Sequence, residues 1–415
     1  MSRRPISRVP DPLRRHSFPH GFAYLLAAAV ATAALGCQDD AGSPNAPDPV
    51  PAPALGATSA AVLAFRQVSA GDGHTCGVTT TNQAYCWGSN AAGQLGDGTI
   101  TQRVRPVAVA GGLPFNRLSA GQFHTCGVTT DFKAYCWGEG GALGDGTTTE
   151  RHIPVRVVGG RRFRQVDAGV HHTCGVSYPD NRGYCWGDNA FGQLGDGTTT
   201  PRMAPTPVAG GLEFQQVATG FLHSCGVTTT GRVFCWGSNQ YGQIGDGSNA
   251  DRRLKPSRID NGRRFHRVDA GWTHSCAVTT DDLAFCWGDG RFGAIGDGRT
   301  VLRFSPRAVA GGLSFDRVTT GTDYACAETP SNVPYCWGSN NFGQFGNGTI
   351  ERSLKPTVAE GGRKFSQVSA GNFHVCGVTP AAAAYCSGSN DSGQLGNGES
   401  GVGLESHTPV AVIGP

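Results

Sequence analysis

Lysine, methionine and long apolar runs are scarce in this sequence of 415 residues, and each scarcity narrows what the chain can be. It has two methionines, four lysines and no basic tract of the kind that binds nucleic acid. The longest uncharged apolar run, residues 21–36, has sixteen residues, whereas a membrane-spanning helix needs roughly 20. These absences argue against a nucleic-acid-binding protein and against a membrane-spanning one.

Motifs of catalysis are missing as well. The sequence contains no Gly-x-Ser-x-Gly, no phosphate-binding glycine-rich loop followed by lysine, and no His-Glu-x-x-His. No stretch of residues 65–415 repeats apolar residues at the period of a helix. We therefore expect a non-enzymatic, all-β chain without a cofactor or a metal site.

Glycine and cysteine are abundant instead. The 63 glycines are about twice the usual share of ~7% and cluster at turns. Fourteen of the 15 cysteines fall into seven pairs, whose first members follow one another after 50, 48, 51, 51, 50 and 50 residues. The pairs are Cys76/Cys86, Cys126/Cys136, Cys174/Cys185, Cys225/Cys235, Cys276/Cys286, Cys326/Cys336 and Cys376/Cys386.

Each repeat unit reads as four short strands separated by turn residues, as in "FRQVSAG", "HTCGVTT", "QAYCWG" and "RPVAVAG". Seven such units of about 50 residues are the arithmetic of a β-propeller, in which each blade buries its faces against its neighbours. An open solenoid is the alternative, but the units lack evident polar caps. We predict a seven-bladed β-propeller over residues 63–415, with four antiparallel strands per blade. The blades start near Phe65, Phe115, Phe163, Phe214, Phe265, Phe315 and Phe365.

The phrase "AGxxH(T/S)C(G/A)VTT…YCWGSNxxGQLGDGT" resembles the repeat of the regulator of chromosome condensation family, and it covers residues 65–415. The resemblance implies a seven-bladed propeller. It implies less about activity, because one fold hosts many functions. Guanine-nucleotide exchange, as in eukaryotic members, is one alternative; bacterial β-lactamase-inhibiting propellers have similar repeats and make protein binding an analogy.

The first 36 residues differ from the repeats. Five arginines precede the apolar run, and "ALGC" resembles the lipobox of bacterial lipoproteins, in which Cys37 would be lipidated. An ordinary signal peptide with an incidental Cys37 is the alternative. Residues 37–62 are rich in proline and alanine and read as a tether. Without the charges of residues 1–36, 29 basic and 30 acidic residues remain. We therefore predict a near-neutral protein of the bacterial cell envelope, extracytoplasmic and lipid-anchored or secreted.

Export places the cysteines in a compartment where disulfides form. Cys76 and Cys86 are symmetric about Thr81, so they can face each other across two antiparallel strands. A bridge closing such a small loop stabilises by about 2.5–3 kcal/mol in the chain-entropy model. A zinc site of His74, Cys76 and Cys86 is the alternative, although zinc prefers a fourth ligand. We predict seven disulfides.

Polar residues that recur in every unit are interpreted as structural. We expect the recurring histidines to hydrogen-bond turns, the Gly-Asp-Gly aspartates to close their own turns, the arginines after them to form ion pairs, and the tryptophans to pack in the core. The histidines are His74, His124, His172, His223, His274 and His374, with Tyr324 in the sixth unit. The aspartates are Asp97, Asp145, Asp196, Asp246 and Asp297, matched by Asn347 and Asn397. The arginines are Arg103, Arg151, Arg202, Arg252, Arg303 and Arg352. Ser387 stands where the other units have tryptophan.

Positions that vary between units are the better candidates for function. The two residues before each histidine differ in every unit, and they lie in the turn that would surround one mouth of the channel. Exposed aromatic side chains gathered on a rim are typical of a recognition surface. The alternative is that they fold inward and plug the channel. The candidate rim residues are Phe123, His171, Phe221, Leu222, Trp272, Asp323 and Phe373.

The sequence therefore predicts an exported binding scaffold, a monomer, that recognises an extracytoplasmic protein or a glycan through a loop face. Nucleic acid is not an expected partner, and the membrane is contacted through the lipid anchor alone. An enzyme with an axial carboxylate site is the remaining alternative. Asp72 and Asp323 are the acids of the variable rim pairs on which it would depend.

Overall fold

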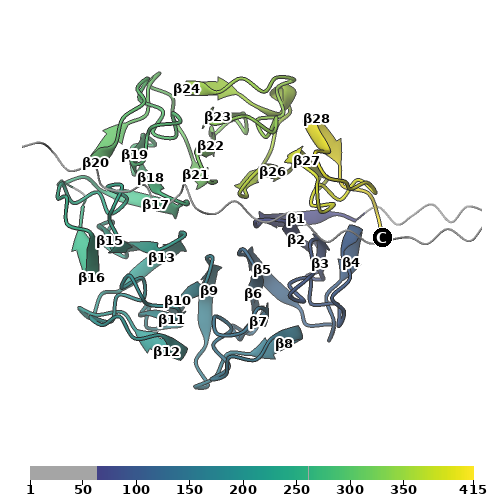
Figure 1. The fold of residues 1–415 in the computed structure, drawn as a ribbon, viewed down its shortest axis with the longest axis horizontal. Coiled ribbons are helices and arrows are strands. Elements are labelled where there is room, and N and C mark those ends of the chain that lie inside the picture. The colour runs from purple at the N-terminus through teal and green to yellow at the C-terminus, as the bar shows by residue number, and fades with distance from the viewer. Residues whose placement is uncertain (1–62, 260) are drawn as a thin grey trace, which may run out of the picture. The chain divides into compact units, whose positions relative to one another are not determined.

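The computed structural model describes residues 63–259 and 261–415, which form seven four-stranded antiparallel sheets arranged in a ring (Figure 1). Each sheet is one blade and consists of four consecutive strands. The predicted closed seven-bladed propeller is confirmed. The predicted signal peptide, the linker and the lipidated Cys37 lie outside the described residues.

The first strand of each blade lines the centre of the ring, and the second lies beside it (Figure 1). The first strands are β1 (Phe65–Ala70), β5 (Phe115–Ala120), β9 (Phe163–Ala168), β13 (Phe214–Thr219), β17 (Phe265–Ala270), β21 (Arg317–Thr320) and β25 (Gln367–Ala370). The second strands are β2 (His74–Thr79), β6 (His124–Thr129), β10 (His172–Ser177), β14 (His223–Thr228), β18 (His274–Thr279), β22 (Tyr324–Glu328) and β26 (His374–Val378).

The third and fourth strands complete each blade toward the outside. The third strands are β3 (Ala84–Gly88), β7 (Ala134–Gly138), β11 (Gly183–Gly187), β15 (Val233–Ser238), β19 (Ala284–Gly288), β23 (Pro334–Gly338) and β27 (Ala384–Ser389). The fourth strands are β4 (Arg103–Ala108), β8 (Arg151–Arg156), β12 (Arg202–Pro207), β16 (Arg252–Arg258), β20 (Arg303–Ala308), β24 (Ser353–Val358) and β28 (Glu405–Ala411). A 3₁₀ turn, η2 (Glu360–Gly362), follows β24.

The core lies between the blades. The residues of the second strand are buried on both faces, because each sheet packs against a neighbour on either side. Phe115 and Trp137 of the second blade pack with Val78 and Leu95 of the first blade in one buried cluster. This arrangement explains why the aromatic residues of the repeat recur at a fixed spacing: each fills the gap to the preceding blade.

Within the described residues the ring closes without an exchanged strand, through side chains and through backbone hydrogen bonds such as that from the Phe65 amide to the Ala382 carbonyl oxygen at 2.8 Å. The last sheet takes all four strands, β25 to β28, from the C-terminal part of the chain. Gln367 reaches across to the first blade, where its Nε2 donates to the Val68 carbonyl oxygen at 2.7 Å and its Oε1 accepts from the Val68 amide at 2.9 Å. Trp87 Nε1 donates to the Gln394 carbonyl oxygen at 2.9 Å.

The interface between the sixth and seventh blades differs from the others. At the other six interfaces an indole N–H donates to a carbonyl of the preceding blade; here Ser387 Oγ lies 3.0 Å from the Gln344 carbonyl oxygen. The buried carboxyl of Glu360 lies against Ser387, with Oε1 2.7 Å from Oγ. A Cβ built on Gly346 would meet Glu360 and Ser387, whereas at Gly96 it would meet the Trp137 indole. Glu360 therefore fills space that an indole fills elsewhere.

Among the residues that the structure describes, no helix has both the length and the apolar character needed to cross a bilayer.

Candidate binding face at the channel mouth

The turn between the first and second strands of each blade is held by its glycine. Gly71 N donates to the His74 carbonyl oxygen at 2.9 Å, and the next amide, of Asp72, donates to the Gly121 carbonyl oxygen of the following blade at 3.2 Å. A Cβ at Gly71 would lie 2.3 Å from that oxygen, so no other residue fits. The same contact recurs around the ring and fixes the variable residues at one end of the channel.

The predicted rim residues divide into an inner and an outer set. The first residue of each variable pair lines a cavity of about 140 Å³ at the channel mouth in six of seven blades: Asp72, Gln122, Val170, Phe221, Trp272 and Asn372. Of the predicted rim residues, Phe221 and Trp272 belong to this inner set. Phe123, His171, Leu222, Asp323 and Phe373 occupy the second position and do not line the cavity.

The aromatic residues of the rim are stacked in pairs across blade boundaries. The rings of Phe221 and Trp272 lie 4.3 Å apart with an interplanar angle of 18°, and both side chains are half-buried. Phe123 and His171 stack at 6.0 Å. Phe373, 37% exposed, contacts Phe342 with ring centroids 5.0 Å apart. Stacked rings have little rotamer freedom left to lose, which favours recognition of a partner.

His171 carries a charge partner on this face. Its Nδ1 lies 3.2 Å from Glu139 Oε2, and the hydrogen bond to Glu139 raises the pKa of His171 above its ordinary value. The same bond lowers the pKa of Glu139. Because both side chains are about 44% exposed, this pair adds a polar, water-accessible contact to the face and little stability.

Asp72 and Asp323 occupy separate environments. Asp72 lies at the mouth and accepts hydrogen bonds from Gln122 Nε2 at 3.0 Å and Asn372 Nδ2 at 2.6 Å. Asp323 lies in the outer set, where burial and the nearby charge of Asp289 raise its pKa to about 6. No hydrogen bond joins the two aspartates in the described part of the chain.

Sequence reasoning missed the residues that the neighbouring loops add to this face. Because the strands of a blade alternate in direction, the loop after the third strand lies at the same end as the turn after the first. Through it Phe342 reaches Phe373, and Arg291 stacks over Tyr241 at 5.2 Å while pairing with Asp289. The pair of residues that precedes each "GQ" or "GA" varies between units. That variation was the sequence signal that could have identified these loop residues.

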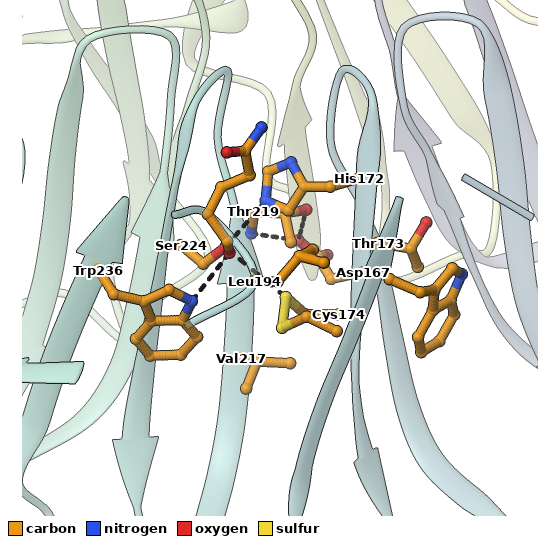
Figure 2. Close-up of a disulfide and its surroundings, with 12 residues drawn as sticks. Asp167, His172, Thr173, Cys174, Leu194, Val217, Thr219, Ser224 and Trp236 are labelled. Atoms are coloured by element: carbon orange, nitrogen blue, oxygen red, sulfur yellow. Dashed lines mark hydrogen bonds between the residues drawn. A yellow bond between two sulfur atoms is a disulfide. The ribbon is translucent and has the colours of Figure 1, made fainter. Parts of the chain in front are cut away.

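Five of the six repeated histidines, all but His274, bond the next blade and not a turn, so that expectation was wrong. His74 Nε2 lies 2.8 Å from Thr125 Oγ1, and Thr125 donates to the Gln94 carbonyl oxygen at 2.8 Å. Figure 2 shows the equivalent contact of His172 with Ser224, beside the disulfide of Cys174. Since the hydroxyl gives its proton to the carbonyl, the histidine must donate from Nε2. Burial lowers the pKa of His74 to about 3, and its ring is neutral.

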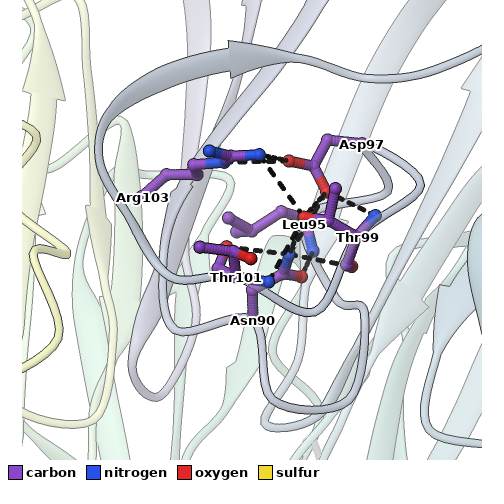
Figure 3. A network of polar contacts seen from close by, with 6 residues as sticks. All are labelled: Asn90, Leu95, Asp97, Thr99, Thr101 and Arg103. Carbon is purple, nitrogen blue, oxygen red and sulfur yellow. Dashed lines mark hydrogen bonds and ion pairs between the residues drawn. The ribbon is translucent and has the colours of Figure 1, made fainter.

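The aspartates of the Gly-Asp-Gly segments close their own turns, as predicted. Asp97 Oδ1 accepts from the Thr99 amide at 2.9 Å and from its hydroxyl at 2.7 Å, and Oδ2 accepts from Arg103 Nε at 3.0 Å (Figure 3). Four of the expected ion pairs form within one blade, those of Arg103, Arg151, Arg202 and Arg303. Among the described residues Arg352 forms none, because its blade has the neutral Asn347 in place of the aspartate. In the fourth blade the partner of Asp246 is Arg253 and not Arg252, whose Nη1 instead donates to the Ala190 carbonyl oxygen.

The seven predicted cysteine pairs form disulfides, each between the second and third strands of one blade. Cys76 and Cys86 stand directly opposite in the β2–β3 ladder, with their Cα atoms 4.0 Å apart, and the other six pairs repeat this register. The further bridges join Cys126 to Cys136, Cys174 to Cys185, Cys225 to Cys235, Cys276 to Cys286, Cys326 to Cys336, and Cys376 to Cys386.

The bridged cysteines are structural residues and not part of the binding face. All fourteen are buried, and none lines the cavity at the channel mouth. The cysteines on the third strands are Cys86, Cys136, Cys185, Cys235, Cys286, Cys336 and Cys386. Because the sulfur atoms bond to each other, no thiolate remains for the zinc alternative. The described residues contain no group of three or more histidine, cysteine or acidic side chains that could hold a metal ion.

Comparison with known proteins matches residues 29–315 to the RCC1-like domain, and residues 335–378 and 365–394 to the regulator of chromosome condensation (RCC1) repeat. Among curated proteins, the ultraviolet-B receptor UVR8 of Arabidopsis thaliana is 33% identical over 122 residues, which are 28% of this chain and 28% of the receptor. The human ubiquitin ligase HERC2 is 30% identical over 121 residues, 28% of this chain and 2% of the ligase. The matched segment thus spans well under two thirds of either relative.

Solved structures share the fold at low identity. RCC1 (Prp20) from yeast, in complex with Kap60, superposes with a TM-score of 0.70 at 20% identity, covering 79% of this chain and 83% of that one. Human WBSCR16 gives a TM-score of 0.66 at 22% identity over 74% of this chain and 84% of that one.

Proposed function

We propose, on the premise that this chain belongs to the RCC1-like domain family, that it is a binding scaffold which recognises a protein through the loop face at the channel mouth. The observation that carries the proposal is the stacking of Phe221 on Trp272 beside the channel, in positions that the repeat leaves free to vary. Aromatic anchors in a rigid setting are typical of binding hot spots.

The chemistry of the face and the partners of a structural relative both favour a protein over a glycan. It combines aromatic pairs with fixed charges, the His171–Glu139 and Arg291–Asp289 pairs, so it offers both apolar and ionic contacts. The structurally similar yeast Prp20 was solved bound to Kap60, and its binding to Gsp1p and histones has been studied. A glycan partner remains an outcome that the experiment below can distinguish.

We propose further that the protein acts outside the cytoplasm, anchored through Cys37. The lipobox-like "ALGC" supports the anchor, and the fourteen remaining cysteines in seven disulfides suit an oxidising compartment. That compartment disfavours exchange of guanine nucleotides on a cytosolic partner. We propose no catalytic role for Asp72, whose hydrogen bonds to Gln122 and Asn372 give it a structural one.

The test is a pull-down from envelope extract with the full chain, followed by affinity measurement of the captured partner. Trp272→Ala should weaken binding by more than about 2 kcal/mol, roughly 30-fold, while the melting temperature stays nearly unchanged. A loss of the ~3–5 kcal/mol of stability typical of a core aromatic would show that Trp272 plugs the channel.

Leu283→Ala is the matched control. Leu283 is 42% exposed and lies in the turn between the second and third strands, at the opposite end of its blade. It should leave partner binding unchanged. Equal loss of binding in both variants would contradict recognition through the mouth, and capture that a glycosidase abolishes would identify a glycan as the partner.

A further inference from the structure

The residue two positions after the phenylalanine that opens each blade lines the far end of the channel, away from the binding face. In four blades this residue is glutamine: Gln67, Gln165, Gln216 and Gln367. Each glutamine clamps the next blade by donating to a carbonyl and accepting from the amide of the same residue. For Gln67 these two bonds to Leu118 measure 2.7 and 3.0 Å.

Three blades carry arginine at this position: Arg117 on β5, Arg267 on β17 and Arg317 at the start of β21. A guanidinium has donors and no acceptor, so it cannot accept from the next blade's amide. At Val368 the acceptor is supplied instead by the buried carboxyl of Glu328. The arginines therefore cannot make the paired hydrogen bonds by which the glutamines join consecutive blades. Contacts between blades do not explain why arginine occupies this position.

The three arginines line one cavity of about 160 Å³, together with the four glutamines. That volume is many times the roughly 10–15 Å³ that one water molecule needs. Among the described residues the exposed side chain of Arg117 makes no hydrogen bond or ion pair, and the buried Nε of Arg267 has no hydrogen-bond partner. Two of the three guanidinium groups thus line the cavity without an ion pair, and Arg317 pairs with Asp316.

Two acids, Asp167 and Asp269, line this cavity, and both already accept hydrogen bonds from the neighbouring blade. Asp167 accepts from the Thr219 amide and hydroxyl, both at 2.8 Å, and Asp269 accepts from the Thr320 amide at 2.7 Å. Burial raises the pKa of Asp269 to about 7 and that of Glu328 to about 7. Asp316, at the edge, lies 3.4 Å from Arg317. Loss of water lowers the pKa of Arg117; the negative charge of Asp167 raises it, and the charges of Arg267 and Arg317 lower it.

We propose that this end of the channel, lined by Arg117, Arg267 and Arg317, binds a tetrahedral oxyanion of the phosphate or sulfate class. An oxyanion accepts several hydrogen bonds at once and matches the planar donor fork of a guanidinium. It also relieves the repulsion among three cations that the channel holds close together. The anion is either free in solution or a monoester carried on a larger molecule.

The test is isothermal titration of the full chain with inorganic phosphate, sulfate and a phosphate monoester, at constant ionic strength set with chloride. Wild type should bind phosphate, and phosphate should raise its melting temperature. Each of Arg117→Gln, Arg267→Gln and Arg317→Gln should weaken binding about tenfold, because each removes charge-assisted hydrogen bonds. These variants should fold well, because glutamine is the residue that the other four blades use.

Arg299→Gln is the control, because it removes the same charge from an exposed position outside the channel. It should leave the affinity unchanged. If the monoester binds as tightly as inorganic phosphate, the ligand is an anion carried on a larger molecule. If the monoester binds much more weakly than inorganic phosphate, the ligand is a free anion. No binding by wild type, or equal loss in Arg299→Gln, overturns the proposal.

Discussion

At the scale of single residues, the interfaces between blades depend on a relay from histidine to hydroxyl to carbonyl. Five of the seven interfaces have it, as in His124, Thr173 and the Ala142 carbonyl oxygen. His274 is an exception: Ala325 stands where a hydroxyl residue is needed, and both ring nitrogens of His274 are buried without a partner. The other exception is the next interface, where Tyr324 replaces the histidine and its hydroxyl lies 2.9 Å from the Gly371 carbonyl oxygen.

Ala325→Thr should complete the relay at His274. Since a buried donor regains its acceptor, we expect the free energy of unfolding to rise by about 1 kcal/mol. Thr125→Ala is the reciprocal variant: it removes the acceptor from His74 and should cost about 1–3 kcal/mol. Thermal or urea unfolding measures both. Destabilisation by both substitutions would mean that the space beside Ala325 does not admit a hydroxyl side chain.

At the scale of the element, the disulfide hairpin is the unit that the chain repeats. The bridge joins two residues directly opposite in the ladder between the second and third strands, so it closes a small loop within one blade. Each bridge therefore stabilises its own hairpin and makes no covalent link between blades.

Cys276→Ala combined with Cys286→Ala should lower stability by about 2–3 kcal/mol without changing the fold. The wild-type chain, denatured without reductant, should present at most one titratable thiol, that of Cys37. Cys276→Ala alone should expose one more. Thiol titration and urea unfolding provide the measurements, and two or more free thiols in wild type would contradict the seven disulfides.

The hairpin also shows how far sequence reasoning reaches. The symmetry of the two cysteines about Thr81 was enough to predict that they face each other across the hairpin, because this depends on local spacing, and the count of repeat units predicted the number of blades. The partner of His74 was out of reach: Thr125 lies 51 residues away and meets it only because two blades pack. Among the rim positions, the sequence located the turn but not its division into residues that line the cavity and residues that do not. The cluster of Arg117, Arg267 and Arg317 could not be predicted from the sequence either, because only the closed ring brings these three residues to one cavity.

At the scale of the whole molecule, buried titratable groups give stability a dome-shaped dependence on pH. Burial lowers the pKa of His74, His124, His172, His223 and His374 from 6.5 to about 3. The unfolded chain thus binds more protons than the folded one in this range, and stability falls as pH drops from about 6.5 toward 3. Burial raises the pKa of Glu360 from 4.5 to about 8, so its contribution is lost as pH rises from about 4.5 through 8.

Glu360→Gln should flatten the alkaline side of this profile. The Ser387 hydroxyl has one proton; when it goes to the Gln344 carbonyl, a protonated Glu360 must donate to Ser387 Oγ, and a glutamine amide donates in the same way. We expect the variant to match wild type near pH 5 and to exceed its melting temperature at pH 9. An unchanged slope above pH 7 would assign the alkaline loss to other buried carboxyls, such as Glu328 and Asp269.

The absence of an exchanged strand has a consequence for how the chain reaches its native state. Contacts between consecutive blades join residues about 50 positions apart, such as Gln67 and Leu118, 51 apart, whereas the closing contact of Gln367 with Val68 spans 299. Loop-closure entropy rises with that separation, and non-local contacts form slowly. During synthesis each blade can dock on its predecessor as it emerges, while the first blade keeps an uncovered flank until the last hairpin arrives. We therefore expect the interface between the seventh and first blades to form last.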